Sequence, residues 1–142
     1  MRGTDTIVLA PIGRVESDFS ESSSVEEMRQ HHSRLVVRPE FTAGLEGLAA
    51  GDRIVVLFYF HRSEGYALRQ HPRGDISRPK QGVFTLRSPR RPNRIGVTVA
   101  YIEDREGNVL HVTGLDALDG TPLLDIKPYV SFFDASGKGE GD

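Results

Sequence analysis

The stretch RIVVLFYF, residues Arg53–Phe60, decides the fold class of this chain. Its β-branched and aromatic residues favour an extended strand, and both faces of that strand are apolar. A strand that is apolar on both faces is typical of the centre of a sheet, where neighbours cover it on each side. The longest apolar run, Ile54–Phe60, is much shorter than a membrane-spanning helix, so we expect no membrane segment. The N-terminal residues include Asp5 and lack a long apolar core, which argues against a signal peptide and favours a cytoplasmic protein.

Outward from this strand, the chain is a series of short strand-like segments separated by turn residues such as Gly107 and Asp119-Gly120. The further strands are expected at residues 7–15, 35–37, 83–86, 95–102, 109–115 and 123–129. Helical patterns are limited to residues 25–32 and to one or two turns within residues 41–48. This pattern predicts a mainly β protein, a single-domain β-barrel with short helices and long loops. We expect the barrel domain to span residues 1–134 and the Gly-rich, charged residues 135–142 to form a flexible tail.

The composition excludes several kinds of chemistry. The 142-residue chain has no cysteine, which excludes disulfides, thiol catalysis and cysteine-ligated zinc. Its five histidines do not fall in metal-binding patterns, so no metal site is expected, and His111 is interpreted as an ordinary strand residue. No dinucleotide-binding glycine motif, phosphate-binding loop or serine nucleophile elbow is present.

Positive charge is concentrated in one part of the chain. The net charge is −2, yet residues 61–94 contain nine arginine or lysine residues and only two acidic residues, Glu64 and Asp75. Four prolines restrict the backbone of this segment. A rigid, cationic segment of this kind favours binding of phosphates or carboxylates, although an arginine-rich loop paired with the acidic remainder of the chain is the alternative.

The motif RSPRRPNRIG, Arg87–Gly96, lies at the end of the cationic segment. Pro89 and Pro92 fix the backbone before a ligand arrives, which lowers the entropic cost of binding. The arginines offer planar donor pairs to an anion, Asn93 offers donors and an acceptor to a base edge, and Gly96 permits close approach of a ligand or backbone. A tight turn with solvated arginines is the alternative. His61, between the central strand and the cationic segment, is a candidate for the rim of such a site.

The motif LDALDGTPLLDIKPY, Leu115–Tyr129, supplies carboxylates, a lysine and a tyrosine around a tight turn. Asp116 and Asp119 could serve only as turn caps. Asp125 differs because it lies within an apolar strand, where a carboxylate needs a partner. Lys127 projects to the same side of a regular strand, so we expect an ion pair with Asp125, either structural or catalytic.

With these two motifs the chain resembles the TsaA-like family, also called YaeB or TrmO. Family members carry R-S-P-x-R-P-N-x-I-G followed by G-L-D-x-x-D-G-T-P-x-x-D-I-K-P-Y, and the resemblance extends over about Ile7–Tyr129. It implies a β-barrel methyltransferase that uses S-adenosyl-L-methionine to N6-methylate threonylcarbamoyladenosine beside the anticodon of tRNA. It also implies a homodimer with cofactor sites near the interface.

Two departures from the family keep other functions open. The counterpart of the Pro-Arg-Gln motif of many members is here Glu27–His31, without the proline, and the C-terminal domain of the larger bacterial members has no counterpart in this sequence. A methyltransferase acting on a small molecule, and a non-enzymatic S-adenosyl-L-methionine-binding module, are the alternatives.

The hypothesis assigns three groups of residues. The cofactor-binding candidates are His61, Arg87, Ser88, Arg90, Pro92, Asn93, Leu118, Asp119, Gly120 and Thr121. The catalytic candidates are Asp125 or Asp116 as the base, with Lys127 and Tyr129 beside them. The RNA-binding candidates are Arg62, Arg69, Arg73, Arg78 and Lys80, whose contacts with phosphates should weaken steeply with salt.

Overall fold

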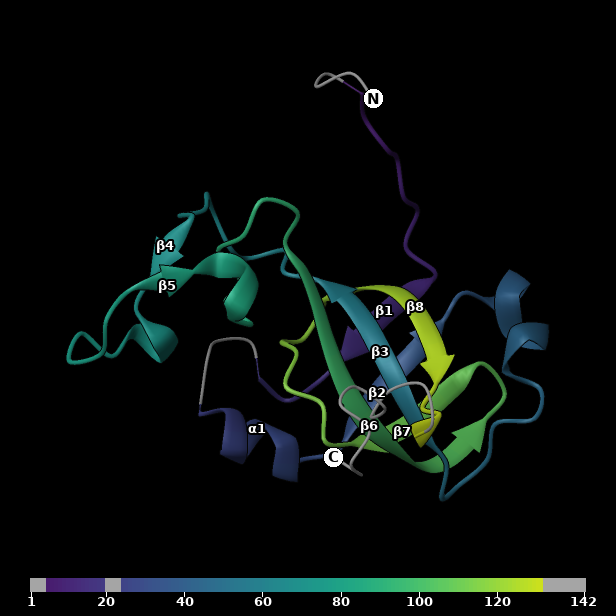
Figure 1. Cartoon of the computed structure of the whole chain (residues 1–142). Coiled ribbons are helices and arrows are strands. Elements are labelled where there is room, and N and C mark those ends of the chain that lie inside the picture. Colours follow the sequence, from purple (N-terminus) through teal and green to yellow (C-terminus); the bar gives the residue numbers. More distant parts are fainter. Residues whose placement is uncertain (1–4, 20–23, 132–142) are drawn as a thin grey trace.

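A closed barrel of six antiparallel strands forms the body of the protein (Figure 1). The computed structural model describes residues 5–19 and 24–131. Around the barrel the strand order is β1-β2-β7-β6-β3-β8, and β1 closes it by pairing with both β2 and β8. The strands are β1 Gly13–Glu16, β2 Ser33–Val37, β3 Arg53–Tyr59, β6 Ile95–Glu106, β7 Val109–Thr113 and β8 Pro122–Pro128. The predicted fold class, mainly β and a barrel, is confirmed.

Alternation of side chains along the strands builds the core. In β3, Ile54, Val56 and Phe58 point inward and are buried, while Val55 and Leu57 on the outer face are half-buried. β3 pairs with β6 on one side and β8 on the other, as expected of a central strand. The inward residues of the other strands join the same cluster, and each buried aliphatic side chain of this size stabilises the fold by about 1.5–3 kcal/mol.

Helices are short and lie outside the barrel. Helix α1, Val25–Gln30, begins at Ser24, whose hydroxyl accepts a hydrogen bond from the Glu27 backbone N–H at 3.1 Å. Its residue Met28 is buried, and the Arg29 carbonyl accepts a hydrogen bond from the Gly114 N–H at 3.1 Å, which holds α1 against the loop between β7 and β8. The 3-10 helix η1 spans Pro39–Leu45. No helix in the described ranges is long and apolar enough to cross a membrane.

The cationic segment forms a separate lobe beside the barrel, inserted between β3 and β6 (Figure 1). We call residues 61–94 the basic lobe. It contains β4 Arg69–Gln70, η2 Pro72–Gly74, β5 Gln81–Gly82 and η3 Val83–Thr85. The predicted strand at residues 83–86 is wrong, because this segment turns on itself: the Leu86 N–H donates to the Val83 carbonyl at 3.0 Å, and the Thr85 hydroxyl donates to the Gly82 carbonyl at 2.7 Å.

Several other sequence-based boundaries differ from the structure, three of them by more than two residues or in the position of a helix end. The strand predicted over residues 7–15 begins only at Gly13, although Ile12 already bonds to the Leu123 carbonyl and the Arg38 N–H. Residues 5–11 extend away from the barrel (Figure 1). Helix α1 stops at Gln30 instead of continuing to His32. β6 continues past residue 102, the predicted end of this strand, as far as Glu106, and the turn is formed by Gly107 and Asn108. The predicted tail, residues 135–142, lies outside the described residues.

Candidate functional site

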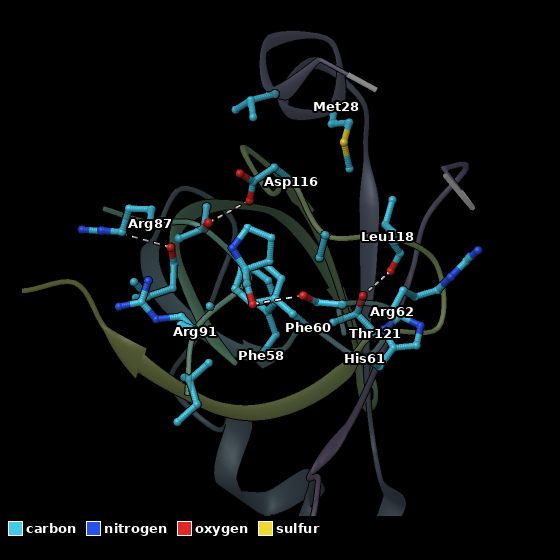
Figure 2. Close-up of a pocket in the computed structure, with 18 of the residues that line it drawn as sticks. Met28, Phe58, Phe60, His61, Arg62, Arg87, Arg91, Asp116, Leu118 and Thr121 are labelled. Carbon is cyan, nitrogen blue, oxygen red and sulfur yellow. Dashed lines mark hydrogen bonds between the residues drawn. The ribbon is translucent and has the colours of Figure 1, made fainter. Parts of the chain in front are cut away.

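A cavity of about 620 Å³ opens between the start of β6, helix α1, the loop after β7 and the inner side of the basic lobe (Figure 2). Both faces of β6 contribute to it, Gly96 and Thr98 from the buried face and Ile95 and Val97 from the outer face. Its volume lies within the roughly 300–1,000 Å³ typical of small-molecule sites. The two sequence motifs meet here, since Arg87–Gly96 and Leu115–Tyr129 each supply part of the lining.

Two phenylalanines form the apolar floor, and Gly96 makes room for them. Phe58 lies directly opposite Gly96 in the β3–β6 ladder, and its ring packs edge-to-face on Phe60 with centroids 5.3 Å apart. A Cβ atom on Gly96 would lie 2.5 Å from Phe58 Cε2 and 2.8 Å from Phe60 Cζ. A residue with a side chain at position 96 would therefore clash with the two aromatic rings of the floor, which explains the glycine of the first motif.

Asp116 provides the carboxylate of the cavity. Its Oδ1 accepts a hydrogen bond from the Thr98 hydroxyl at 2.8 Å (Figure 2). Its Oδ2 lies 3.6 Å from a guanidinium nitrogen of Arg29 on α1. The Asp116 side chain is 20% exposed, so it is accessible from the cavity but largely shielded from bulk water. Thr98 orients the carboxylate, and Arg29 balances its charge.

The arginines of the first motif divide into two kinds. Arg91 donates to the Leu86 and Ser88 carbonyls at 2.9 and 3.1 Å, and Arg94 donates to the Tyr59 hydroxyl at 2.7 Å. These two side chains hold the loop in place. Arg87 makes one long hydrogen bond, 3.3 Å to the Val97 carbonyl, and remains exposed at the cavity rim. Because a guanidinium carries five N–H donors, Arg87 keeps donors for a ligand.

The structure brings four of the ten predicted cofactor-binding residues together around the cavity. They are His61, Arg87, Leu118 and Thr121. Gly120 lies beside them, since a Cβ there would be 3.9 Å from His61 Nε2. The tight turn at this position is closed by the Thr121 hydroxyl, which donates to the Leu118 carbonyl at 2.6 Å (Figure 2).

The other predicted cofactor-binding residues lie elsewhere. The Ser88 hydroxyl accepts from the Arg90 N–H at 3.1 Å and the Asp119 carboxylate accepts from the Ser17 N–H at 3.0 Å, so Ser88 and Asp119 stabilise turns, and Arg90 lies outside the cavity lining. Pro92 and Asn93 line a second cavity of about 780 Å³, which includes Leu124 and part of the extended N-terminal segment. The structure therefore does not place Asn93 with Arg87 in one binding site.

Three of the four predicted catalytic residues lie on the outer face of the barrel. The expected ion pair forms, with Lys127 Nζ 2.9 Å from Asp125 Oδ2, and the two side chains are 60% and 48% exposed. The Tyr129 ring lies under the Arg53 guanidinium at 4.3 Å from its centroid. None of these side chains lines the cavity, because residues 125, 127 and 129 point away from the barrel interior.

The predicted RNA-binding residues are all exposed on the basic lobe, and Arg62 also lines the cavity. Side-chain bonds to main-chain carbonyls hold the lobe together: Gln70 donates to the Ala67 and Arg90 carbonyls, each at 2.7 Å. Arg73 has φ +52°, a left-handed conformation that is unusual for a residue with a side chain. Its position between the buried Pro72 and Gly74 presents the guanidinium to solvent on a fixed backbone.

His61 lies at the rim with its pKa lowered. Partial desolvation beside the cavity is the main cause, and the neighbouring Arg62 charge adds to it. The ring is therefore neutral near pH 7. A neutral imidazole adds no further positive charge to a rim that already carries Arg62 and Arg87.

Sequence analysis missed several residues of this cavity. Val25, Met28 and Arg29 reach it from α1, and Phe84 and Leu86 from the basic lobe. The segment Glu27–His31 resembles a family motif only in part, and the position of its Arg29 beside Asp116 depends on how α1 packs against the barrel. The sequence does contain one indication for Phe84: it lies three residues before Arg87, the start of the first motif, and could therefore be expected near the same site. No group of three or more potential metal ligands occurs among residues 5–19 and 24–131.

Comparison with known proteins identifies the family. Residues 15–135 match the family described as the tRNA-methyltransferase O N-terminal domain. The chain belongs to this family. A crystal structure of TrmO from Pseudomonas aeruginosa is similar, with a TM-score of 0.74 and 34% sequence identity, covering 96% of this chain and 62% of that one.

Relatives by sequence carry two kinds of description. A probable S-adenosyl-L-methionine-binding protein of Methanothermobacter thermautotrophicus is 38% identical over 92% of this chain and 96% of its own length. The tRNA (adenine(37)-N6)-methyltransferase of Homo sapiens is 35% identical over 93% of this chain. The chain spans only 32% of the human protein's length, so its similarity is to one part of that enzyme.

Proposed function

We propose that this protein transfers a methyl group from S-adenosyl-L-methionine to N6 of an adenine beside the anticodon of tRNA, with threonylcarbamoyladenosine as the modified base. The supporting observation is the cavity in which the two family motifs meet around Asp116. Membership of the tRNA-methyltransferase O family makes the chain an S-adenosyl-L-methionine-dependent tRNA methyltransferase. The particular modified adenosine, a homodimeric assembly and a cytoplasmic location are further parts of the proposal.

The cavity fits the cofactor in size and chemistry. Phe58 and Phe60 offer apolar surface to a nucleoside, and the Leu118–Thr121 turn lines the opposite side. Arg87 retains donors for the methionine carboxylate. Neutral His61 avoids repulsion of the positively charged sulfonium. The bound cofactor supplies an activated methyl group for in-line displacement, so much of the catalysis consists of alignment.

Asp116 is the proposed base. The N6 nitrogen of a threonylcarbamoylated adenine is a weak nucleophile because its lone pair is delocalised, and it must lose its proton as the new bond forms. Asp116 is the one predicted catalytic residue among the cavity-lining side chains. Thr98 fixes Oδ1, which leaves Oδ2 on the side of Arg29 as the oxygen that receives the proton.

The basic lobe is the proposed RNA-binding surface. Arg69, Arg73, Arg78 and Lys80 are exposed on the lobe that forms one wall of the cavity, so phosphates bound there would lie near the methyl-transfer site. Binding through about four phosphates should make the logarithm of the association constant fall steeply with the logarithm of salt concentration. A flat salt dependence would contradict this role.

Arg73 offers a sharp test of the lobe. Arg73→Asn removes a phosphate contact while placing a residue that tolerates the left-handed backbone, so we expect unchanged or slightly higher thermal stability. We expect tRNA affinity to fall and the salt slope to decrease by about one. Arg38→Ala, which removes an exposed arginine paired with Glu40 outside the lobe, is the matched control and should leave tRNA affinity unchanged.

For the homodimer, we propose the outer face of β6 and β3 as the interface. Val99 and Tyr101 are 38% and 49% exposed, and the half-buried Val55 lies opposite Val99 in the ladder. Val97, on the same face, also lines the cavity, so the interface would border the cofactor site. Light scattering should give twice the chain mass, and Val99→Glu should give a monomer; a wild-type monomer would contradict this part of the proposal.

The acceptor is tested by incubating the protein with labelled S-adenosyl-L-methionine and either total tRNA or a small-metabolite extract. We expect label in tRNA, and digestion to nucleosides should place it on N6-methylated threonylcarbamoyladenosine. Label in the metabolite extract alone would favour a small-molecule methyltransferase. Cofactor binding without transfer to either pool would favour a non-enzymatic binding module.

A further inference from the structure

An exposed phenylalanine, Phe84, lies at the rim of the cavity. Phe84 is 77% exposed, yet it lines the cavity from the basic lobe. Full burial of a phenylalanine side chain would stabilise the fold by about 1.5–3 kcal/mol, and the exposed Phe84 ring lacks most of this stabilisation. The cavity edge that it occupies adjoins the cationic surface proposed to bind RNA.

The backbone that carries Phe84 is firmly held. Val83, next to it, is 1% exposed, and its N–H donates to the Leu68 carbonyl at 2.8 Å. The Leu86 N–H closes the η3 turn on the Val83 carbonyl, and Thr85 is held from both sides, donating to the Gly82 carbonyl and accepting from the Gln81 amide at 3.0 Å. With Val83 anchored inward, the turn projects Phe84 outward at a fixed place.

The other side of the cavity presents a second apolar side chain at the surface. Val25 at the start of α1 is 38% exposed and lines the cavity, and Met28, one turn later, is buried beneath it. Phe84 and Val25 thus form apolar parts of the rim on two different elements. A planar, apolar ring face that enters between the lobe and α1 would bury both side chains.

We infer that Phe84 is the stacking residue for the acceptor adenine, a role that rests on the proposed function. An enzyme that modifies a base must receive it unstacked from its neighbours, and an aromatic side chain replaces the lost stacking. We assign Phe84 to the acceptor because its ring lies at the exposed edge of the cavity, on the lobe that carries the cationic side chains proposed to hold the RNA phosphates. The aromatic floor of Phe58 and Phe60 lies deeper in the cavity and serves the cofactor.

The test uses the whole protein and three variants. Phe84→Ala removes the ring, and Phe84→Trp retains an aromatic face. Ile76→Ala is the matched control, because Ile76 is an apolar residue of the lobe, 83% exposed, and does not line the cavity. The probe is an anticodon stem-loop RNA with 2-aminopurine at the target position, whose fluorescence is quenched by stacking, and the titration contains no cofactor.

We expect the bound probe, once unstacked from its neighbours, to be brighter in Phe84→Ala than in the wild type, Phe84→Trp and Ile76→Ala, where an aromatic ring at position 84 stacks on it. In methyl transfer to tRNA, Phe84→Ala should raise KM by about 10- to 100-fold, the range that loss of one stacked base implies. Its affinity for S-adenosyl-L-methionine, measured by calorimetry, should stay within twofold of the wild type, which separates an acceptor role from a cofactor or folding role.

Unchanged KM and quenching in Phe84→Ala would overturn the inference while leaving the proposed function intact. A loss of cofactor affinity equal to the loss in KM would also overturn it, because the ring would then stack on the cofactor. A wild-type protein that binds the cofactor but methylates no tRNA would overturn the proposed acceptor and this inference together. The wild-type assay is enough to detect that outcome, so it is distinguishable from a failure of the Phe84 inference.

Discussion

Asp116 and Asp125 belong to one motif, nine positions apart, yet they lie in two different parts of the molecule. Asp116 lines the cavity, is 20% exposed and is held by Thr98. Asp125 lies on the outer face of the barrel, is 48% exposed and pairs with Lys127. The same residue type thus lies beside the cavity in the loop before β8 and forms a surface ion pair within β8. The pleat of the strand and the closure of the barrel decide which carboxylate reaches the cavity.

The largest effect is expected from neutralising each carboxylate in turn. Asp116→Asn should lower kcat for tRNA methylation by at least about 100-fold, the usual contribution of a general base. Asp125→Asn should stay within twofold of the wild type, because its side chain does not line the cavity. Single-turnover transfer of labelled methyl at saturating cofactor measures both. A greater loss in Asp125→Asn than in Asp116→Asn would reverse the comparison.

The next effect concerns the glycine at the cavity floor. Gly96→Ala should destabilise the protein by about 1–3 kcal/mol, the typical cost of overpacking, since the new Cβ meets two phenylalanine rings. Gly82→Ala is the matched control, because a Cβ there has no neighbour within 4 Å and its backbone conformation, φ −64°, suits any residue. Thermal unfolding followed by circular dichroism should show a melting temperature several degrees lower for Gly96→Ala alone. Equal melting temperatures would show that the floor is looser than the structure indicates.

A smaller effect follows from the lowered pKa of His61 on the cavity side. The folded protein binds this proton less readily than the unfolded chain does, so His61 should reduce the free energy of unfolding as pH falls below about 6.5, the ordinary histidine value. That loss is absent at higher pH and complete below the lowered folded-state pKa. Urea unfolding between pH 5 and pH 8 should therefore show a steeper acid-side decline for the wild type than for His61→Gln. If the free energy of unfolding declined equally with falling pH in both proteins, the decline would come from titratable groups other than His61.

The smallest effect is expected on the outer face. A double-mutant cycle on Asp125 and Lys127 should give a coupling free energy of about 0.2–1 kcal/mol, as is usual for exposed ion pairs. The same cycle on Thr98 and Asp116, with the hydrogen bond to a shielded carboxylate, should give a larger value of about 1.5–3 kcal/mol. A stronger coupling on the outer face would show that solvent does not screen the surface pair as its exposure suggests.

Much of the barrel was predictable because its strands have local signals. The apolar run at Arg53–Phe60 and the turn at Asp119-Gly120 are readable without knowing their partners, and both are found as expected. Residues 7–11 carry the same apolar character but belong to no strand, and no local pattern reveals that. Ile12 is the transition, since its N–H donates to the Leu123 carbonyl at 2.8 Å and its carbonyl accepts from the Arg38 N–H at 2.8 Å. Residues 83–86 also resemble a strand, yet Thr85 and Leu86 close a turn through nearby carbonyls.

The site was only partly predictable for a similar reason. The two motifs identify the cavity, but a motif does not show which of its arginines form hydrogen bonds within the protein and which remain accessible to a ligand. Arg91 and Arg94 hold main-chain and tyrosine oxygens, whereas Arg87 remains at the rim. Arg29 and Phe84 approach the cavity from segments outside both motifs, so their roles depend on how α1 and the basic lobe pack against the barrel.

The most direct test of the central claim compares the two cavities. Leu118 lines the cavity around Asp116, and Leu124, which is also half-buried, lines the second cavity with Asn93. Each is replaced by tryptophan, and binding of S-adenosyl-L-methionine is measured by calorimetry on variants whose circular dichroism matches the wild type. Leu118→Trp should abolish detectable binding and Leu124→Trp should retain it. Loss of binding in Leu124→Trp with normal affinity in Leu118→Trp would place the cofactor in the second cavity and contradict the account.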